Sequence, residues 1–182
     1  HAILAYVRTL APVESHIPPR SLEVPVNFVV RTIPSEPRYG TRPPASDRVA
    51  YGEYLTRAAA CTECHTPRND QGQPLPGRTF AGGQEFRFPD RGYRVRTANI
   101  TPDADTGIGA WTEQQFVDKF KSFEAPDDRV LTDAEQRQNT VMPWRMYAGM
   151  TRADLGAIYT FLRSQKPVTS RIEKWPDSVG FQ

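Results

Sequence analysis

The chain has 182 residues, of which 38% are hydrophobic and 24% are charged, and its formal net charge at neutral pH is +2. This composition is typical of a folded globular domain and excludes a largely disordered chain. The small net charge gives no support for a nucleic-acid partner, and without a run of about 18 apolar residues no transmembrane segment is predicted.

The first residues repeat a pattern found near the end of the chain. Residues 2–13 align with residues 157–168, and Ala, Ile, Arg, Pro and Val recur at matched positions. Repeats indicate duplicated units, so we expect Ala2–Leu10 to form a helix that resembles the closing helix of a preceding domain. Chance similarity between two short amphipathic helices is the alternative. The proline-rich residues 18–46 are then predicted to be an irregular linker or wrapping arm.

Three further segments have the apolar spacing of amphipathic helices. Thr112 and Gln115 form a capping box at the start of the second, and Thr151 with Asp154 resembles a capped start of the third. The predicted helices run from just after Asp47 into Cys61, over Glu113–Ser122 and over Thr151–Ser164. The residues between them, 66–106 and 125–142, are predicted to be loops.

Charge is unevenly distributed in the second half of the chain. Residues 78–96 contain five arginines and two carboxylates, whereas residues 103–135 contain nine carboxylates and three basic residues. A domain with a basic and an acidic face has a dipole that can orient it toward a charged partner. Solvated loop charges are an equally good interpretation.

The motif Cys-Thr-Glu-Cys-His occupies residues 61–65. Two thiols three residues apart can add to the two vinyl groups of one haem, and the histidine that follows is then held beside the iron. The motif therefore predicts one covalent haem c attached to Cys61 and Cys64, with His65 as an iron ligand.

Three other interpretations of this motif are less well supported. A thioredoxin-like redox pair requires a surrounding βαβ pattern, which the sequence lacks. A structural zinc site requires four Cys or His ligands, and the only other histidines, His1 and His16, lie in the N-terminal region. A disulfide between Cys61 and Cys64 would close a strained loop.

The sequence offers three methionines as candidates for the sixth iron ligand. A thioether opposite the histidine would raise the reduction potential and close the iron to other ligands. Met142 is favoured because it ends a long loop and precedes Pro143, which disfavours a helix there. Met150 is expected to pack against the final helix, a core position is one interpretation of Met146, and any of the three could instead fill interior space.

The order of these features resembles a class I cytochrome c. Three segments narrow the resemblance to the cytochrome subunits of bacterial membrane-associated alcohol, aldehyde and gluconate dehydrogenases: Phe80–Gly83, Asn99–Asp103 and Thr106–Thr112. The resemblance covers roughly residues 46–168. Those relatives often carry several haem domains in one chain, but this sequence has a single haem motif, so a multi-haem relay does not carry over.

The resemblance implies an all-α, class I cytochrome c fold, with few helices and long loops around one haem and an irregular N-terminal arm. It also implies that the first and last helices cross at Gly52, with Phe161 packed opposite, because glycine permits a close approach. We expect residues 1–46 to form an N-terminal helix and a proline-rich arm, residues 47–170 the haem domain and residues 171–182 a C-terminal tail.

The resemblance extends to individual site residues. It implies that Met142, followed by Pro143, is the axial ligand. Trp111 and Arg96 are candidates for contact with the haem propionates, since an indole N–H can donate and a guanidinium can pair bidentately. A core role for Trp111 and a surface role for Arg96 are the alternatives. Asn99 is expected to brace the loop beside the haem.

The expected function is electron transfer by the single haem c with His/Met ligation. The chain would act as a carrier or as a subunit of a respiratory or dehydrogenase electron-transfer chain. Its partners would be donor and acceptor redox proteins, with a larger membrane-associated complex as one setting, and it would not be an enzyme by itself. A catalytic or gas-binding haem with an open sixth position is the competing hypothesis. Haem attachment to this motif resembles a process outside the bacterial cytoplasmic membrane, which predicts a periplasmic or outer-face location.

Overall fold

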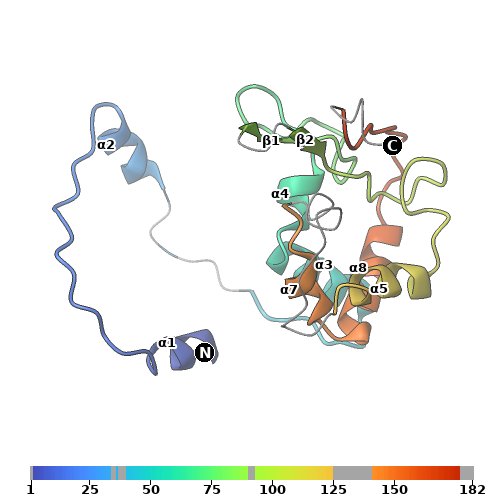
Figure 1. Ribbon diagram of the computed structural model, residues 1–182, viewed down its shortest axis with the longest axis horizontal. Coiled ribbons are helices and arrows are strands. Elements are labelled where there is room, and N and C mark those ends of the chain that lie inside the picture. Colours follow the sequence, from blue (N-terminus) through green and yellow to red (C-terminus); the bar gives the residue numbers. More distant parts are fainter. Residues whose placement is uncertain (1, 34–35, 37–39, 90–92, 125–140, 177–182) are drawn as a thin grey trace. The chain divides into compact units, whose positions relative to one another are not determined.

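The structure, a computed structural model, describes residues 2–33, 36, 40–89, 93–124 and 141–176. The chain divides into two compact units, residues 1–40 and residues 41–182 (Figure 1). Each unit is described by itself. Most of the loop predicted over residues 125–142 lies outside the described residues. Among the described helices, none is both long enough and apolar enough to cross a membrane.

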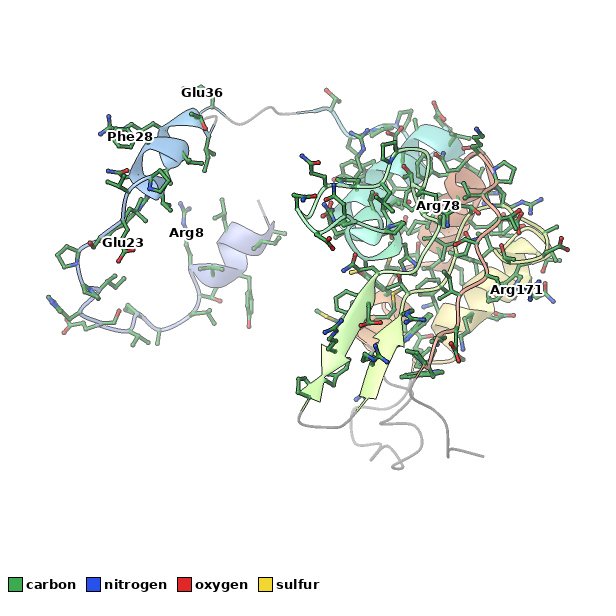
Figure 2. All side chains as sticks on the ribbon, turned by 90° about the horizontal axis from the view of Figure 1, so that it is seen from above. Arg8, Glu23, Phe28, Glu36, Arg78 and Arg171 are labelled. Carbon is green, nitrogen blue, oxygen red and sulfur yellow. The ribbon has the colours of Figure 1, made fainter. Side chains whose placement is uncertain are left out.

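Unit 1, residues 1–40, consists of short helices without buried residues. It contains α1 (Ala2–Val7), α2 (Val26–Val29) and the 3₁₀ turn η1 (Val30–Thr32). The helix predicted at Ala2–Leu10 is confirmed over its first six residues, whereas α2 and η1 lie in a segment predicted to be irregular. Phe28 on α2, labelled in Figure 2, is 58% exposed. Unit 1 therefore has no hydrophobic core of its own among its described residues.

The two copies of the internal repeat end their helices in the same way. Near the end of α1, the Thr9 hydroxyl donates to the Tyr6 carbonyl over 2.7 Å. At the aligned position after α8 (Arg152–Arg163), the Ser164 hydroxyl donates to the Phe161 carbonyl, also over 2.7 Å. The same bond also occurs at Thr32 and Ser122, outside the two aligned segments, so the duplication stays a prediction.

The core of unit 2, residues 41–182, is built on the crossing of α3 (Arg48–Ala58) and α8, with α5 (Glu113–Lys121) packed beside α8. The close approach expected at Gly52 is confirmed: a Cβ atom there would lie 2.0 Å from the Ala157 carbonyl oxygen. A buried apolar cluster contains side chains of α5, of α8 and of the loop segments that precede α5: Phe80, Ile108, Phe116, Ile158, Phe161 and Leu162.

Side-chain caps define where the long helices begin. Asp47 accepts a hydrogen bond from the Ala50 amide at the start of α3, and Thr151 accepts one from the Asp154 amide before α8. The predicted capping box is confirmed, because Thr112 accepts from the Gln115 amide while the Gln115 side chain accepts from the Thr112 amide. These bonds satisfy amides that have no partner within the helix.

Replacing Thr112 with alanine should lower the free energy of unfolding by about 1 kcal/mol, since the first turn of α5 loses its side-chain acceptor. Urea denaturation followed by circular dichroism would measure the change. Thr112→Ser is the matched control because it keeps the hydroxyl. Equal losses in both variants would contradict a role for the cap.

Two helix boundaries differ from the predictions. The helix starting after Asp47 does not run into Cys61: it ends at Ala58, Ala60 takes a left-handed conformation with φ 52°, and α4 (Cys61–His65) starts afresh. Pro143 does not prevent a nearby helix either, because α7 (Trp144–Ala148) begins directly after it. A proline is tolerated at a helix start, where its missing N–H has no intrahelical acceptor.

An antiparallel hairpin departs from the expected all-α fold. β1 (Glu85–Phe88) pairs with β2 (Tyr93–Arg96), with Phe86 opposite Val95 and Arg87 opposite Arg94. The reason is the alternation of apolar and charged residues with a period of two, which favours a strand even in a segment rich in Gly, Pro and Arg. The observed fold is thus helix-rich with few helices and one small sheet, which is compatible with a cytochrome c-like fold.

Candidate functional site

A cavity of about 350 Å³ lies inside unit 2. Its walls come from α4, α5, α7, α8, the hairpin and the segment after α8, and they are mostly apolar. Its volume is in the range typical of small-molecule and cofactor pockets. Seven of the eight predicted site residues line it: Cys61, Cys64, His65, Arg96, Trp111, Met142 and Pro143.

The two cysteines stand on the single helical segment α4 and are free thiols. Burial raises the pKa of the Cys61 thiol to about 11. Burial also raises the pKa of Cys64, with a further contribution from the nearby Glu63 carboxylate. Both side chains are therefore protonated thiols at neutral pH.

His65 is the most completely buried of the three motif residues. Its side chain is held by a 2.7 Å hydrogen bond between Nδ1 and the Ala98 carbonyl oxygen. Burial lowers the pKa of His65, although the hydrogen bond to Ala98 acts in the opposite direction. A neutral imidazole that donates from Nδ1 presents the unprotonated Nε2 as a metal ligand.

Two of the three methionines contribute to the cavity. Met142, directly before Pro143 and α7, and Met150, directly before the N-cap of α8, both line it. Met150 also packs against the buried cluster that includes residues of α8, as expected. Met146 does not lie in the core, the position considered for it from the sequence, because it is 79% exposed on α7.

Trp111 and Arg96 lie at the cavity wall with part of their surface accessible. Trp111 is 39% exposed, so it is not a core residue, and its backbone carbonyl accepts a hydrogen bond from the Tyr159 hydroxyl. The Arg96 guanidinium is paired with Glu85 over 3.2 Å. The partly exposed Trp111 side chain is thus placed where a carboxylate of a bound group could meet it, whereas the Arg96 guanidinium is engaged by Glu85.

Asn99 lies behind the cavity wall rather than in it. Its amide nitrogen donates to the Val168 carbonyl over 2.8 Å and to the Thr106 hydroxyl over 3.0 Å. Its amide oxygen accepts from both the backbone and the hydroxyl of Thr101. Asn99 therefore ties the loop beside Ala98, which holds His65, to the segment that follows α8.

Replacing Asn99 with alanine should lower the free energy of unfolding by about 2–3 kcal/mol, because buried partners such as the Thr101 amide lose their hydrogen bonds. Urea denaturation would measure this loss of unfolding free energy. Asn69→Ala is the matched control: Asn69 also bonds backbone amides, but in an exposed turn. Comparable losses in both variants would contradict a bracing role for Asn99.

Several cavity residues were not identified from the sequence. The Tyr147 hydroxyl donates to the Ala59 carbonyl over 2.6 Å and so ties α7 to the chain just before Cys61. Lys119 and Lys174 also line the cavity. Lys174 comes from the predicted tail, and nothing in the local sequence signals this position, because it depends on a contact with β2 nearly eighty residues earlier.

Similarity to known proteins agrees with this geometry. The chain is 32% identical over 130 residues to the cytochrome c subunit of a quinone-dependent alcohol dehydrogenase from Gluconacetobacter polyoxogenes, covering 71% of this chain and 24% of that protein. It is 34% identical over 136 residues to the gluconate 2-dehydrogenase cytochrome c subunit of Pantoea cypripedii, covering 72% and 27%. The fructose dehydrogenase cytochrome subunit of Gluconobacter japonicus is 31% identical over 142 residues, covering 76% and 25%.

The chain resembles a haem c domain of these cytochrome subunits. The resemblance inferred from the sequence motifs is thereby confirmed for the alcohol and gluconate dehydrogenases. No protein-family model matches the chain. The chain spans about a quarter of the length of these relatives, as the 24% and 25% coverages show. The similarity therefore concerns a part of these longer subunits and not the whole of them.

The residues of the cavity fit a haem c. Two neighbouring thiols, a buried imidazole with Nε2 available, and the thioether of Met142 or Met150 are the groups that haem c attachment and ligation use. The remaining wall is mainly apolar, with buried side chains such as Leu155 and Ile158. Such a wall suits a large flat macrocycle and excludes water from it.

Proposed function

We propose that unit 2 holds a single haem c through Cys61 and Cys64, with His65 and Met142 as axial ligands, and transfers single electrons between redox proteins. The observation that supports this most directly is the shared cavity, which brings the haem motif together with Met142, 77 residues further along the chain from His65. When bound, haem c supplies reversible one-electron chemistry between Fe(III) and Fe(II).

The chain's own residues orient and insulate this group. The Ala98 carbonyl fixes the ring and tautomer of His65, and the Gly82 amide donates to the His65 carbonyl over 2.8 Å, which anchors the end of α4. Pro143 restricts the backbone next to Met142. Trp111 and Arg96 are proposed to bind the propionates. Together these contacts would keep the axial ligands in place when the charge of the iron changes.

The cavity offers little to a catalytic mechanism. Among the described residues that line it there is no Asp or Glu that could act as a general base. The relatives are named as cytochrome subunits of dehydrogenases. We therefore infer that the chain is an electron carrier or an electron-transfer subunit and not an enzyme by itself.

The same relatives support a place in a larger assembly. By analogy, the chain would pass electrons from a dehydrogenase toward a respiratory acceptor, within a membrane-associated complex at the periplasm or the outer face of the cytoplasmic membrane. The division into an arm over 1–46, a haem domain over 47–170 and a tail over 171–182 stays a prediction.

Absorption spectra of the purified protein, oxidised and reduced, with and without carbon monoxide, test the proposed function. We expect haem c bands, a far-red thioether-to-iron band in the oxidised form and no change with carbon monoxide. A high-spin spectrum that shifts with carbon monoxide would instead indicate an open iron and a catalytic or gas-binding role. Absence of haem bands in protein made with the maturation machinery would overturn the proposal. A Cys61→Ser, Cys64→Ser double variant is the control for covalent attachment.

A further inference from the structure

The helix α7 carries the proposed ligand Met142 at its entrance. The Met142 carbonyl accepts a hydrogen bond from the Trp144 amide over 2.8 Å. The Pro143 carbonyl accepts one from the Met146 amide over 3.0 Å. These bonds couple the backbone before α7 to the helix itself, so the position of the Met142 side chain in unit 2 depends on the position of α7.

The short length of α7 makes its position dependent on tertiary contacts. The helix has five residues, little more than one turn. Helices this short are not stable on their own in water, because the cost of fixing the first turn is not recovered. Contacts with the rest of unit 2 must therefore hold α7, and the structure provides them from two directions, from α5 and from the chain before Cys61.

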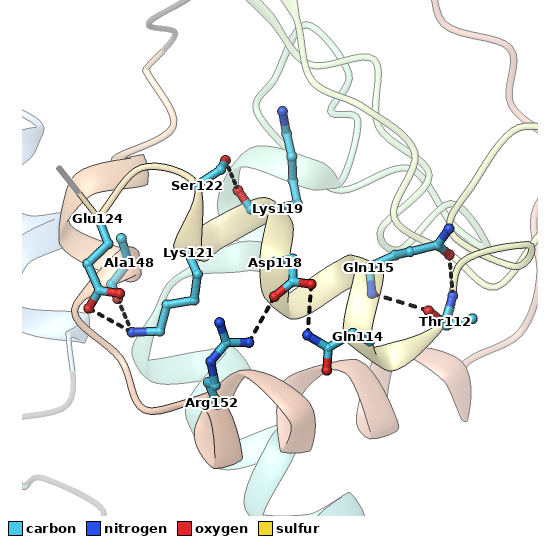
Figure 3. A network of polar contacts seen from close by, with 10 residues as sticks. All are labelled: Thr112, Gln114, Gln115, Asp118, Lys119, Lys121, Ser122, Glu124, Ala148 and Arg152. Carbon is cyan, nitrogen blue, oxygen red and sulfur yellow. Dashed lines mark hydrogen bonds and ion pairs between the residues drawn. The ribbon is translucent and has the colours of Figure 1, made fainter.

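The contacts with α5 hold one side of α7. The Trp144 ring stacks on Phe123 with 4.8 Å between centroids, and it lies 5.3 Å from the ring of Phe120. Lys121, the last residue of α5, donates from its ammonium group to the Ala148 carbonyl over 2.6 Å (Figure 3). A cation here satisfies a carbonyl that has no partner within its own helix. All these partners belong to α5 and the residues just after it, and none belongs to the haem motif.

Tyr147 supplies the contact on the side of the haem motif. Its hydroxyl donates to the Ala59 carbonyl over 2.6 Å. Ala59 follows the end of α3, the chain then turns through the left-handed Ala60, and Cys61 begins α4. All four residues line the cavity. One hydrogen bond thus joins the helix that follows Met142 to the residues that precede the first haem thiol.

Both partners of this bond favour it. Burial raises the pKa of Tyr147, so the hydroxyl keeps the proton with which it donates. The Ala59 carbonyl lies at the end of α3, where carbonyls have no amide partner within the helix. A carbonyl at the wall of an apolar cavity loses free energy when its donor is removed.

We propose that Tyr147 is a positioning residue for the sixth iron ligand: its bond to Ala59 holds α7, and with it the Met142 thioether, against the haem motif. This inference rests on the proposed His65/Met142 ligation and deepens it. A methionine ligand raises the reduction potential, which by linkage means that it binds Fe(III) less tightly than Fe(II). In the oxidised protein, ligation by Met142 thus depends most on how firmly the thioether is held in place.

Replacement of Met142 on the iron is then coupled to movement of α7. Met142 is only two residues ahead of the helix, and Pro143 restricts the backbone between them. For the thioether to leave and make room for another ligand, α7 has to move away from the haem motif, and this movement breaks the bond between Tyr147 and Ala59. The free energy of that bond is therefore part of the cost of replacing Met142.

Imidazole binding to the oxidised holoprotein tests this positioning role. At about pH 8 imidazole is mostly uncharged, and it binds Fe(III) by taking the position of Met142, which removes the far-red band. Tyr147→Phe keeps the ring and removes only the hydroxyl. We expect this variant to bind imidazole about three- to tenfold more tightly than the wild type, the ratio that one hydrogen bond represents. In stopped-flow traces at saturating imidazole, the far-red band should also be lost faster than in the wild type.

Tyr159→Phe is the matched control. The Tyr159 hydroxyl also donates to a backbone carbonyl over 2.6 Å, but the bond runs from α8 to Trp111 and does not involve α7. We expect its affinity for imidazole to stay within about twofold of the wild type. Equal gains in both variants would overturn the proposal, because a general loosening of unit 2 would then explain them. An unchanged affinity in Tyr147→Phe would overturn it as well.

Amide hydrogen exchange gives a readout that does not involve a change of iron ligand. In the reduced holoprotein the amides to follow are those of Met146 and Gly149, which are bonded to the Pro143 and Met146 carbonyls. They should exchange about three- to tenfold faster in Tyr147→Phe than in the wild type. Tyr159→Phe should leave their exchange unchanged. Unchanged exchange in Tyr147→Phe would contradict the proposal, since α7 would then stay in place without the bond.

The far-red band before imidazole is added separates a failure of this inference from a failure of the proposed function. A wild type that lacks the band has no thioether on the iron, so both would fail together. A wild type that shows the band, with a Tyr147→Phe variant that responds to imidazole as the wild type does, would refute the positioning role alone and leave the His65/Met142 ligation intact.

Discussion

Replacing Gly52 with alanine is expected to lower the free energy of unfolding by about 3 kcal/mol or more. A Cβ atom at this position would lie 2.0 Å from the Ala157 carbonyl oxygen and 2.8 Å from Cβ of Phe161. Both atoms are held in place by the backbone of α8, so the clash can be relieved only if α3 and α8 move apart. Overpacking of this kind costs about 1–3 kcal/mol when side chains can adjust, and more when backbone must move. Alanine's helix propensity offsets only about 1 kcal/mol of this.

Urea denaturation of the haem-loaded protein would measure the loss, and Gly156→Ala is the matched control. Gly156 is also inside a helix, but a Cβ there meets mainly the ends of the Glu113 and Arg48 side chains. These side chains are 45% and 47% exposed, so they can move aside. We expect Gly156→Ala to be within about 1 kcal/mol of the wild type. Similar stabilities for the two variants would contradict the importance of the α3–α8 crossing.

Replacing Met142 with alanine should have the largest effect on the redox properties. If Met142 is the axial ligand, the far-red band should disappear, carbon monoxide should bind the reduced protein, and the reduction potential should fall by roughly 0.1 V or more. That shift is a modest part of the range of about 0.8 V that axial ligation covers. Spectroscopy and a redox titration would measure these changes.

The other two methionines provide the controls. Met146→Ala should leave the spectrum and the potential unchanged, because that side chain is 79% exposed. Met150→Ala should keep the far-red band but lower the free energy of unfolding by about 2–5 kcal/mol, since Met150 packs against the buried cluster. Loss of the band in Met150→Ala and its retention in Met142→Ala would overturn the assignment.

Local features of the site could be derived from the sequence by itself. The haem motif is a matter of spacing over five residues. The capped starts at Thr112 and Thr151 depend on bonds between residues three apart, and the structure reproduces them. The apolar spacing of the last helix likewise predicts which of its side chains are buried, such as Leu155 and Ile158. In each case the interacting groups are close together along the chain, so the local sequence is enough to predict the contact.

Other features were decided by the tertiary structure. The bond from His65 to Ala98 spans 33 residues, and the bond from Tyr147 to Ala59 spans 88. The exposure of Met146, and the meeting of Lys174 with Arg96, likewise depend on how α7 and the last segment pack.

Such contacts form only when the chain has closed long loops, and the gain from burying apolar surface has to exceed the entropy lost in closing them. The sequence by itself determined the haem motif and the capped helices. The packing of unit 2 decided which side chains meet around that motif.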